Sequence, residues 1–522
     1  MKRLLLAAAF LAGACSSVPA PPAGTDADTV AWWGITGDLS SDAMEGRDTG
    51  SAGYDRAADY VEQRFRAAGL KPAGESGGYR QTLLLKEVRV EKEGTSFEVV
   101  TSLEGVPPEG GVRMVESRSK LEFLQEITVR PTAALREVIQ ARLAFRGYCS
   151  AGEMADVERK VVICFGARRA GMTTGAQRLE AAAKAGAVGI INVDDPGFTI
   201  EPSRWPEAYA RSVTFRDAPP PAYPEMVVMR LSADALDTLL MWSDEDAEAI
   251  LKAGAASQPL PSFDLGSWLV AKFATSQREL QSDNVLALLP GTDPALKDEV
   301  VLVSAHLDGY GYGEPVNGDA LYNGAFDDAA YVASLIRLAE RQAGAGFGRS
   351  VLFAVYTGEE KGLLGSNYFA SHLTVPKDKI AAVINLDQLR PLFPLKALTM
   401  HGITDTTLVG NVRRVAGAMG IEVRPDLEPE RNLNQRTDHF PFLRMGVPAT
   451  NFVFAFDPGS ESEVKYREWY QSRYHRPQDD MGQPLDWDAA RDMNLFFYRL
   501  TEDVANDPVR PAFVAGSPWA PK

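Results

Sequence analysis

The chain has 522 residues, of which 45% are hydrophobic and 24% charged, and its formal net charge is −16. This composition is typical of globular proteins and excludes disordered, collagen-like and coiled-coil classes. A mean hydropathy of −0.17 excludes a polytopic membrane protein. The negative charge repels phosphate backbones, so nucleic acid is not expected as a partner. Three cysteines, Cys15, Cys149 and Cys164, are too few for a disulfide scaffold or a cysteine zinc site, so a bound metal would need histidine and carboxylate ligands.

The first 14 residues are predicted to be an export signal. Met1-Lys2-Arg3 precedes the apolar run LLLAAAFLAGA, which is too short to span a bilayer as a permanent helix. The stretch LAGAC resembles a bacterial lipoprotein box, in which the cysteine, here Cys15, is acylated. We therefore expect an exported chain: a lipoprotein facing the periplasm, with membrane contact only through Cys15, or otherwise a periplasmic or secreted protein. The Pro- and Ala-rich residues 15–30 are predicted to be a tether.

Hydrophobic periodicity then predicts the elements in order. An amphipathic helix is predicted to end at Gly69, and residues 83–130 alternate as strands do. From about residue 133 a strand, RKVVICFG, is followed by a helix, LEAAAKAGA, and a second strand, VGIINVDD. This compact unit predicts an inserted domain of residues 133–264. The helical positions before Gly69 are Ala57, Tyr60, Val61, Phe65 and Ala68.

From Leu265 onward the sequence predicts an α/β fold. Near-continuous apolar runs are typical of strands that are covered on both faces, as in a largely parallel sheet. The fold class is therefore predicted as a mixed, largely parallel sheet with helices on both faces, formed by the discontinuous segments 31–132 and 265–510. The runs are NVLALLPG, VVLVSAHLD, VLFAVYTGEE and AAVINLDQL, and a last helix is predicted from the stripe Ala490, Met493, Phe497, Leu500 and Val504.

Ionisable side chains follow consecutive strands of this segment. Ligands bind at the carboxyl ends of strands in open α/β sheets, so these side chains are expected to meet there. Gathered carboxylates repel one another, and a divalent cation is the usual reason that such a cluster persists. A histidine among them suits zinc or cobalt better than calcium and admits manganese. The residues are His306 and Asp308, then Asp327 and Asp328 at the start of a helix, then Glu359 and Glu360, and finally Asp387.

The motifs AHLD, NGAFDD, TGEE, INLD and YHRPQDD, in this order, resemble those of the co-catalytic dizinc peptidases. This family holds bacterial leucyl aminopeptidases, yeast aminopeptidase Y and glutamate carboxypeptidase II. Residues 39–74 resemble the N-terminal helix region of the same proteins, and the unit from RKVVICFG to VGIINVDDP resembles a protease-associated domain. The resemblance covers most of residues 31–505. It implies a zinc-peptidase (phosphorylase/hydrolase-like) fold with an inserted protease-associated domain at 133–264.

The resemblance also implies roles for single residues. Glu359 would be the general base acting on a water that bridges two zinc ions, with cobalt or manganese as substitutes for zinc. Asp308 would be the orienting carboxylate, and Asp328 would be structural. The implied zinc ligands are His306 and Asp387 for one ion, Glu360 and His475 for the other, and Asp327 as the bridge between them.

Several points stay open at this stage. Relatives often carry an aromatic residue before Ser/Thr-Asp-His, but here Asn432-Leu433-Asn434 precedes that segment, so the oxyanion donor is unassigned. Tyr470 and Tyr474 are candidates for it. Asp438 and His439 are expected near the site without being ligands, and His372 and His401 are predicted to serve packing or the surface. Cys149 and Cys164 are predicted either to form a disulfide or to be free thiols.

The predicted function is a zinc-dependent exopeptidase acting on peptides, with an aminopeptidase as the leading hypothesis. A carboxypeptidase or dipeptidase would need a cationic anchor for a substrate carboxylate, for which Arg390 and Arg436 are candidates. A glutaminyl cyclase with one zinc and a non-catalytic binding protein, such as the related transferrin receptor ectodomain, are further alternatives. The presence of Glu359 and of all implied ligands argues against both. The sequence does not determine side-chain preference, native metal, oligomeric state or the role of the inserted domain.

Overall fold

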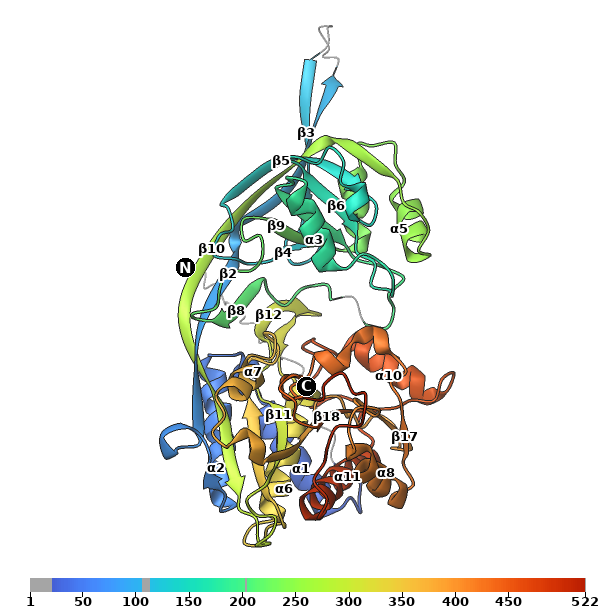
Figure 1. The fold of residues 1–522 in the computed structure, drawn as a ribbon. Coiled ribbons are helices and arrows are strands. Elements are labelled where there is room, and N and C mark those ends of the chain that lie inside the picture. Colours follow the sequence, from blue (N-terminus) through green and yellow to red (C-terminus); the bar gives the residue numbers. More distant parts are fainter. Residues whose placement is uncertain (1–20, 106–112, 202–203, 522) are drawn as a thin grey trace, which may run out of the picture.

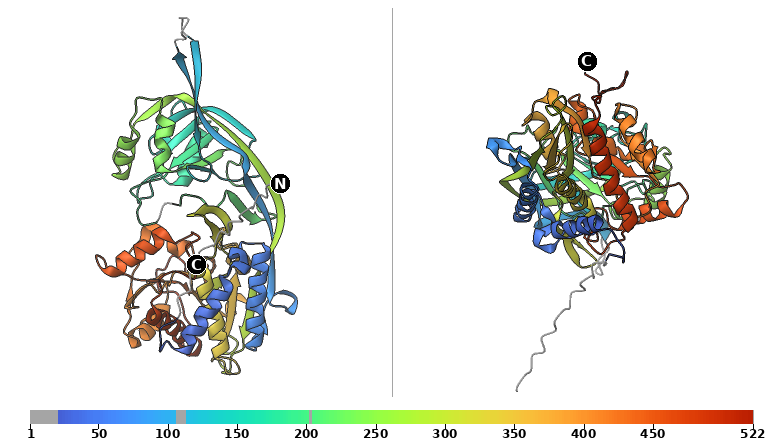
Figure 2. Two further views of the ribbon diagram at one scale, coloured as in Figure 1. Left: turned by 180° about the vertical axis from the view of Figure 1, so that it is seen from behind. Right: turned by 90° about the horizontal axis from the view of Figure 1, so that it is seen from below.

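The computed structural model describes residues 21–105, 113–201 and 204–521, so the predicted export signal and Cys15 lie outside the described residues. Figure 1 shows two lobes, one above the other, and Figure 2 shows them from behind and from below. The upper lobe comprises most of residues 113–262 and the adjoining halves of two long antiparallel strands, β2 (Arg80–Gly105) and β10 (Ser262–Leu289). Strand β8 (Arg211–Phe215) lies between the lobes, where Val213 packs with Leu364 (Figure 1). Strands β2 and β10 run along one side of both lobes (Figure 1). No helix in the described part of the chain is long and apolar enough to cross a membrane.

The lower lobe is built on a mixed sheet. Strand β11 (Val300–His306) lies parallel to both β14 (Ser350–Tyr356) and β15 (Ile380–Asn385). Strand β15 also runs parallel to β18 (Ala449–Thr450), while β10 is antiparallel to β14. All residues of β11, β14 and β15 are buried, which is why their sequences are apolar throughout. The prediction of a mixed, largely parallel sheet is confirmed.

Helices cover both faces of this sheet, as predicted. Val301 and Phe353 belong to a core shared with α1 (Ala27–Leu39), α2 (Ala52–Ala67), α6 (Ala330–Arg341) and α11 (Trp487–Asn506). Leu302 and Leu352 belong to a separate core shared with α7 (Leu364–Ser371) and α9 (Phe440–Arg444). Side chains alternate across a strand, so neighbouring residues of β11 and β14 feed different cores.

Two helices near the N-terminus show how the local sequence sets their limits. Helix α2 begins after the N-cap Ser51 and ends two residues before Gly69, whose φ of +79° continues no helix. Helix α1 begins at Ala27, inside the stretch predicted as a tether to residue 30. The side chain of Asp26 caps it by accepting a hydrogen bond from the Thr29 amide, and the buried Trp32 anchors it in the core.

In the upper lobe the same sheet continues, through the pairing of β10 with β5 (Val138–Arg146), into the parallel strands β6 (Val161–Phe165), β7 (Gly189–Val193) and β9 (Val227–Leu231), with α3 (Gly175–Lys184) beside them. The core of the upper lobe also takes in Phe97 of β2 and Leu269 of β10, which lie outside residues 133–264. The exact limits of an inserted domain therefore stay a prediction. Cys149 and Cys164, left open by the sequence, form a disulfide here.

The sequence did not predict several smaller elements. A separate sheet joins β16, β17 and β19 beside α8, and β12 pairs with β13 in a hairpin. The remaining strands are β1 (Lys71–Pro72), β3 (Arg113–Leu121), β4 (Ile127–Val129), β12 (Gly311–Val316), β13 (Asp319–Tyr322), β16 (Ala397–Met400), β17 (Glu422–Arg424) and β19 (Phe452–Phe454). The remaining helices are α4 (Leu236–Leu240), α5 (Ala247–Ala255), α8 (Leu408–Ala418) and α10 (Glu461–Ser472).

The disulfide gives a first prediction. Replacing both Cys149 and Cys164 by Ala is expected to lower the free energy of unfolding by about 3 kcal/mol, because the bond closes a loop with a sequence separation of 15. Urea unfolding followed by circular dichroism would measure the loss, and reduced wild-type protein should match the double variant. An unchanged unfolding midpoint would contradict a stabilising role.

Candidate metal centre

The predicted site residues gather at the carboxyl edge of the parallel strands. His306 is the last residue of β11, and Glu359 and Glu360 follow the end of β14. Asp387 lies just beyond β15. Because neighbouring parallel strands end at the same edge of the sheet, these side chains lie close together. Asp327 lies on a short π-helical turn (Ala325–Ala329) before α6, where its φ and ψ are not helical. The loop after α10 supplies His475.

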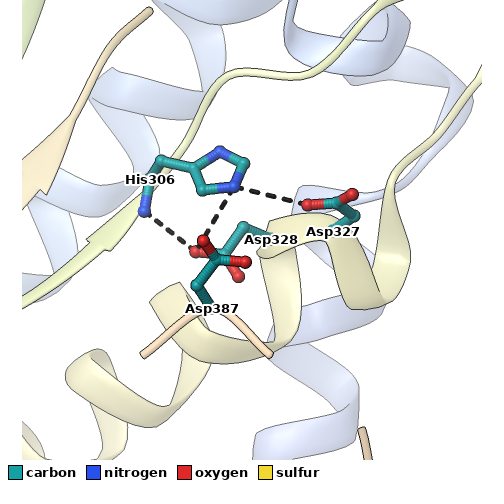
Figure 3. Close-up of side chains that lie close together, drawn as sticks. All are labelled: His306, Asp327, Asp328 and Asp387. Carbon is teal, nitrogen blue, oxygen red and sulfur yellow. Dashed lines mark hydrogen bonds and ion pairs between the residues drawn. The ribbon is translucent and has the colours of Figure 1, made fainter. Parts of the chain in front are cut away.

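One group of donors surrounds His306, and Figure 3 shows it with Asp327, Asp328 and Asp387. His306 Nε2 lies 3.3 Å from Asp327 Oδ1, 3.9 Å from Asp328 Oδ2 and 4.0 Å from Glu359 Oε2. One donor atom from each of the four residues in the figure lies within 4.8 Å of the others. All four side chains are buried, so solvent does little to screen their charges.

A second group of donors consists of Asp327, Glu360 and His475. His475 Nε2 lies 3.3 Å from Asp327 Oδ2 and 3.4 Å from Glu360 Oε1. The two oxygens of Asp327 therefore face two different histidines. This side chain is the member that the two groups share.

These residues fit divalent cations. Asp327 Oδ2 and Asp328 Oδ1 are buried oxygens without a hydrogen-bond partner in the described structure. Burying a carboxylate oxygen without a partner is costly unless a cation balances it. Imidazole nitrogen with carboxylate oxygen is a donor set that zinc, cobalt and manganese accept. The geometry brings all five predicted ligands together. It also adds Asp328 to the first group, although Asp328 Oδ2 already accepts a hydrogen bond from the His306 amide at 2.9 Å.

Residues 284–501 match the family model described as peptidase family M28. This segment belongs to peptidase family M28. The match confirms the family predicted from the motifs, and it supports the predicted class of enzyme, a metallopeptidase.

Curated relatives agree with the family match. A probable leucine aminopeptidase 2 from Aspergillus oryzae is 27% identical over 253 residues, covering 45% of this chain and 46% of the relative. Aminopeptidase Y from Saccharomyces cerevisiae is 26% identical over 219 residues, covering 40% of this chain and 36% of the relative. The chain thus spans about half or less of the length of these relatives.

Solved structures extend the likeness to nearly the whole chain. An aminopeptidase from Aneurinibacillus sp. strain AM-1 is similar with a TM-score of 0.60 and 18% identity, covering 93% of this chain and 97% of the other. A zinc aminopeptidase from Bacillus subtilis has a TM-score of 0.57 and 16% identity, covering 92% of this chain and 96% of the other. At these identities the comparison shows a shared fold.

Within the M28 domain, Asp308 connects the loop after β11 to the loop after β14. Its carboxylate accepts hydrogen bonds from the amides of Glu359 at 2.9 Å and Glu360 at 3.3 Å, and from the Thr49 hydroxyl at 3.1 Å. Burial alone would raise the pKa of Asp308, but His306, the charge of Lys361 and the hydrogen bond from the Glu359 amide together lower that pKa. Asp308 is therefore placed to hold the backbone on which both glutamates stand.

Glu359 borders a cavity that reaches both groups of donors and is described below. Burial raises its pKa well above that of an ordinary carboxyl group, and the charges of Asp387 and Glu360 add to this while His306 opposes it. A carboxylate whose pKa is raised accepts a proton more readily near neutral pH, which suits an acid–base group.

Asp479, in the last motif, has a role that the sequence did not predict. Its carboxylate accepts hydrogen bonds from the amides of Phe326 at 2.9 Å and Asp327 at 3.0 Å, and from the side chain of Gln483. It thereby holds the turn that carries Asp327. Burial raises the pKa of Asp479 to about 6. Its position in the motif was visible in the sequence, but its partners were not.

Tyr310 is the functional neighbour that sequence reasoning missed. Its hydroxyl donates to Glu360 Oε2 at 2.7 Å and lies 3.1 Å from His475 Nδ1. The only signal in the sequence was its place two residues after Asp308.

Two tyrosines were candidates for the donor that stabilises an oxyanion. Tyr474 stacks on the His475 ring and borders the same cavity as Glu359, whereas the Tyr470 hydroxyl donates to Gln388.

The remaining histidines lie outside the two groups of donors. His439 is held by Thr437 and Asn434, while Asp438 accepts a hydrogen bond from Ser366. His401 is buried and packs near His439, and His372 stacks on Tyr368 at the surface.

Two cavities meet at the donors of the M28 domain. One, of about 340 Å³, is bordered by four of the donors together with Leu363, Leu433 and Arg436; these four are Asp327, Glu360, Asp387 and His475. The other, of about 310 Å³, is bordered by residues of the segment 204–213, which runs from the upper lobe to the region between the lobes. Both share Tyr310, Glu360 and His475.

Proposed function

We propose that this protein is an exported aminopeptidase that uses two zinc ions to release N-terminal residues from peptides. The observation that carries the proposal is Asp327, whose two oxygens face His306 and His475 at 3.3 Å each, with Glu359 beside them. The aminopeptidases among the relatives and among the similar structures support the same activity.

In this proposal the predicted ligands keep their roles. His306 and Asp387 would hold one zinc ion, Glu360 and His475 would hold the other, and Asp327, which belongs to both groups of donors, would serve both. When bound, the ions supply Lewis acidity that polarises the scissile carbonyl and makes a water molecule more acidic.

The residues of the chain perform the proton transfers. Glu359 accepts a proton from the attacking water and delivers it to the leaving amine, so the group ends the cycle as it began. Asp308 contributes by holding the amides of Glu359 and Glu360 in place. The excess of carboxylates around the cavity also suits the ammonium group of a peptide N-terminus.

The two arginines considered as anchors for a substrate carboxylate are engaged within the protein. Arg390 is buried against the rings of Trp469 and Tyr470 and donates to Gln388. Arg436 pairs with Glu201 of the upper lobe. Their engagement favours the aminopeptidase over a carboxypeptidase.

One observation supports a carboxypeptidase or dipeptidase as the second candidate. Arg204 is exposed, borders both cavities and forms no ion pair with the residues that the structure describes. It could receive the C-terminal carboxylate of a short peptide. The complete set of two-metal ligands disfavours a one-zinc glutaminyl cyclase, and the presence of Glu359 disfavours a non-catalytic binding protein.

Removing single ligands tests the metal count. Asp327→Ala should reduce bound zinc from about two ions per chain to almost none, whereas His475→Ala should leave about one, because only Asp327 faces both groups. Mass spectrometry of the dialysed protein measures the metal. His372→Ala, at an exposed histidine, is the matched control and should retain both ions. Equal loss in both ligand variants would refute the shared role of Asp327.

Replacing Glu359 by Gln should lower kcat by about 100- to 10,000-fold without changing the zinc content, since the amide cannot accept the proton. Steady-state hydrolysis of an aminoacyl-p-nitroanilide together with metal analysis checks both points. Glu430→Gln, at an exposed glutamate outside the metal centre, should behave as wild type. Wild-type turnover in Glu359→Gln would reject Glu359 as the base.

Blocking either end of a peptide separates the two candidate activities. An aminopeptidase should lose cleavage when the N-terminus is acetylated and keep it when the C-terminus is amidated. Chelation should abolish cleavage of the free peptide, and added zinc should restore it. If amidation rather than acetylation blocks cleavage, and Arg204→Ala lowers the rate on the free peptide, the carboxypeptidase or dipeptidase replaces the leading proposal.

A further inference from the structure

We propose that Tyr310 is a positioning residue that holds His475 and Glu360 ready for the second metal ion, and that Tyr209 of the upper lobe supports Tyr310 in this task. The inference rests on the proposed two-metal function. It concerns a side chain outside the predicted ligands and bases, and it links the upper lobe to the metal centre.

The hydrogen bonds around Tyr310 determine which nitrogen of His475 is free. A tyrosine hydroxyl has one proton, and an ionised carboxylate only accepts hydrogen bonds. The Tyr310 proton therefore goes to Glu360 Oε2 at 2.7 Å, and the Tyr310 oxygen accepts from His475 Nδ1 at 3.1 Å. With the proton on Nδ1, the lone pair of His475 lies on Nε2. This is the nitrogen that faces Asp327 and Glu360.

His306 obtains the same orientation in another way. Its Nδ1 lies 3.0 Å from the backbone carbonyl oxygen of Asp308, which can only accept, so its Nε2 is also free to bind a metal. The backbone thus orients the histidine of the first group, while a single side-chain hydroxyl orients that of the second. Removing this hydroxyl should therefore affect the two metal positions unequally.

The ring of Tyr310 is held from the upper lobe. Tyr209 packs against it with ring centroids 5.7 Å apart, and Lys361 Nζ lies 4.9 Å from the centre of the Tyr310 ring. Lys361 donates to the Tyr209 hydroxyl and lies 3.2 Å from Asp48 Oδ1. The backbone beside Tyr209 is fixed too, because the Ala208 carbonyl accepts from the Glu314 amide at 3.0 Å. The position of the upper lobe and that of Tyr310 are thereby connected.

The test is Tyr310→Phe, which removes the hydroxyl and keeps the ring contacts. Stepwise zinc dissociation constants, measured by competition with a chromophoric chelator, should show one constant weakened by about 10- to 100-fold and the other unchanged. Tyr312→Phe is the matched control: Tyr312 lies on β12, is 63% exposed, and should give wild-type constants. The unfolding midpoint of the metal-free protein should be the same in wild type and both variants.

Tyr209→Ala tests the support from the upper lobe and serves as a second variant if Tyr310→Phe fails to fold. It should weaken the same zinc constant by several-fold and leave the other unchanged. Wild-type constants in Tyr310→Phe, or equal weakening of both constants, would overturn the role of Tyr310. Wild-type constants in Tyr209→Ala would overturn the role of Tyr209.

These outcomes are distinct from failure of the proposed function. A wild-type protein that binds two zinc ions but cleaves no peptide would reject the peptidase and leave the role of Tyr310 to be decided by the binding constants. A wild-type protein that binds no zinc would reject both.

Discussion

The carboxylate of Asp327 lies between two histidines that come from distant parts of the chain, and both groups of donors in the candidate metal centre share this one side chain. His306 ends a central strand, and His475 follows a helix near the C-terminus. Their Nε2 atoms each lie 3.3 Å from a different oxygen of Asp327. Several further carboxylates are buried nearby, and Arg390, 3.8 Å from Asp327 Oδ2, balances only part of their charge, so bound divalent cations would relieve the remaining repulsion. The site is therefore both the proposed reaction centre and the place where repulsion between buried carboxylates destabilises the fold.

Hydrogen bonds from backbone amides to two other carboxylates keep the site residues in position despite this repulsion. Asp308 accepts from the amides that follow β14, and Asp479 accepts from the amides of the turn that carries Asp327. Both are motif residues, so the motifs contain positioning residues as well as the proposed metal ligands. A charged acceptor on a backbone amide makes a stronger hydrogen bond than a neutral one, which suits a site that must stay rigid against the repulsion of its own ligands.

The parts that could be predicted from the sequence are those in which local pattern and tertiary structure agree. The run VVLVSAH forms a strand buried on both faces, and the side chains that follow it reach the sheet edge as expected. The contact between Tyr310 and His475 could not be predicted, since 165 residues separate them and neither residue reveals its partner. The change in sequence pattern predicted domain boundaries at residues 133 and 264. The long strands β2 and β10 contribute to both lobes, so the core of the upper lobe includes residues outside those boundaries.

The upper lobe contacts the surroundings of the donors in two places, at Glu201 and at Tyr209. Glu201 is buried among Arg168, Arg431 and Arg436. Burial alone would raise its pKa, but the charges of Arg436, Arg168 and Arg204 lower that pKa to about 2. This cluster ties the upper lobe to the loop of Leu433 and Arg436, which borders one cavity, while residues 204–213 wall the other. Tyr209, in that second wall, backs the ring of Tyr310. Because this segment borders a cavity at the donors and, in our proposal, supports a side chain that positions the second metal ion, a change in it should alter KM and zinc affinity together. A wall that only limited access would alter KM alone.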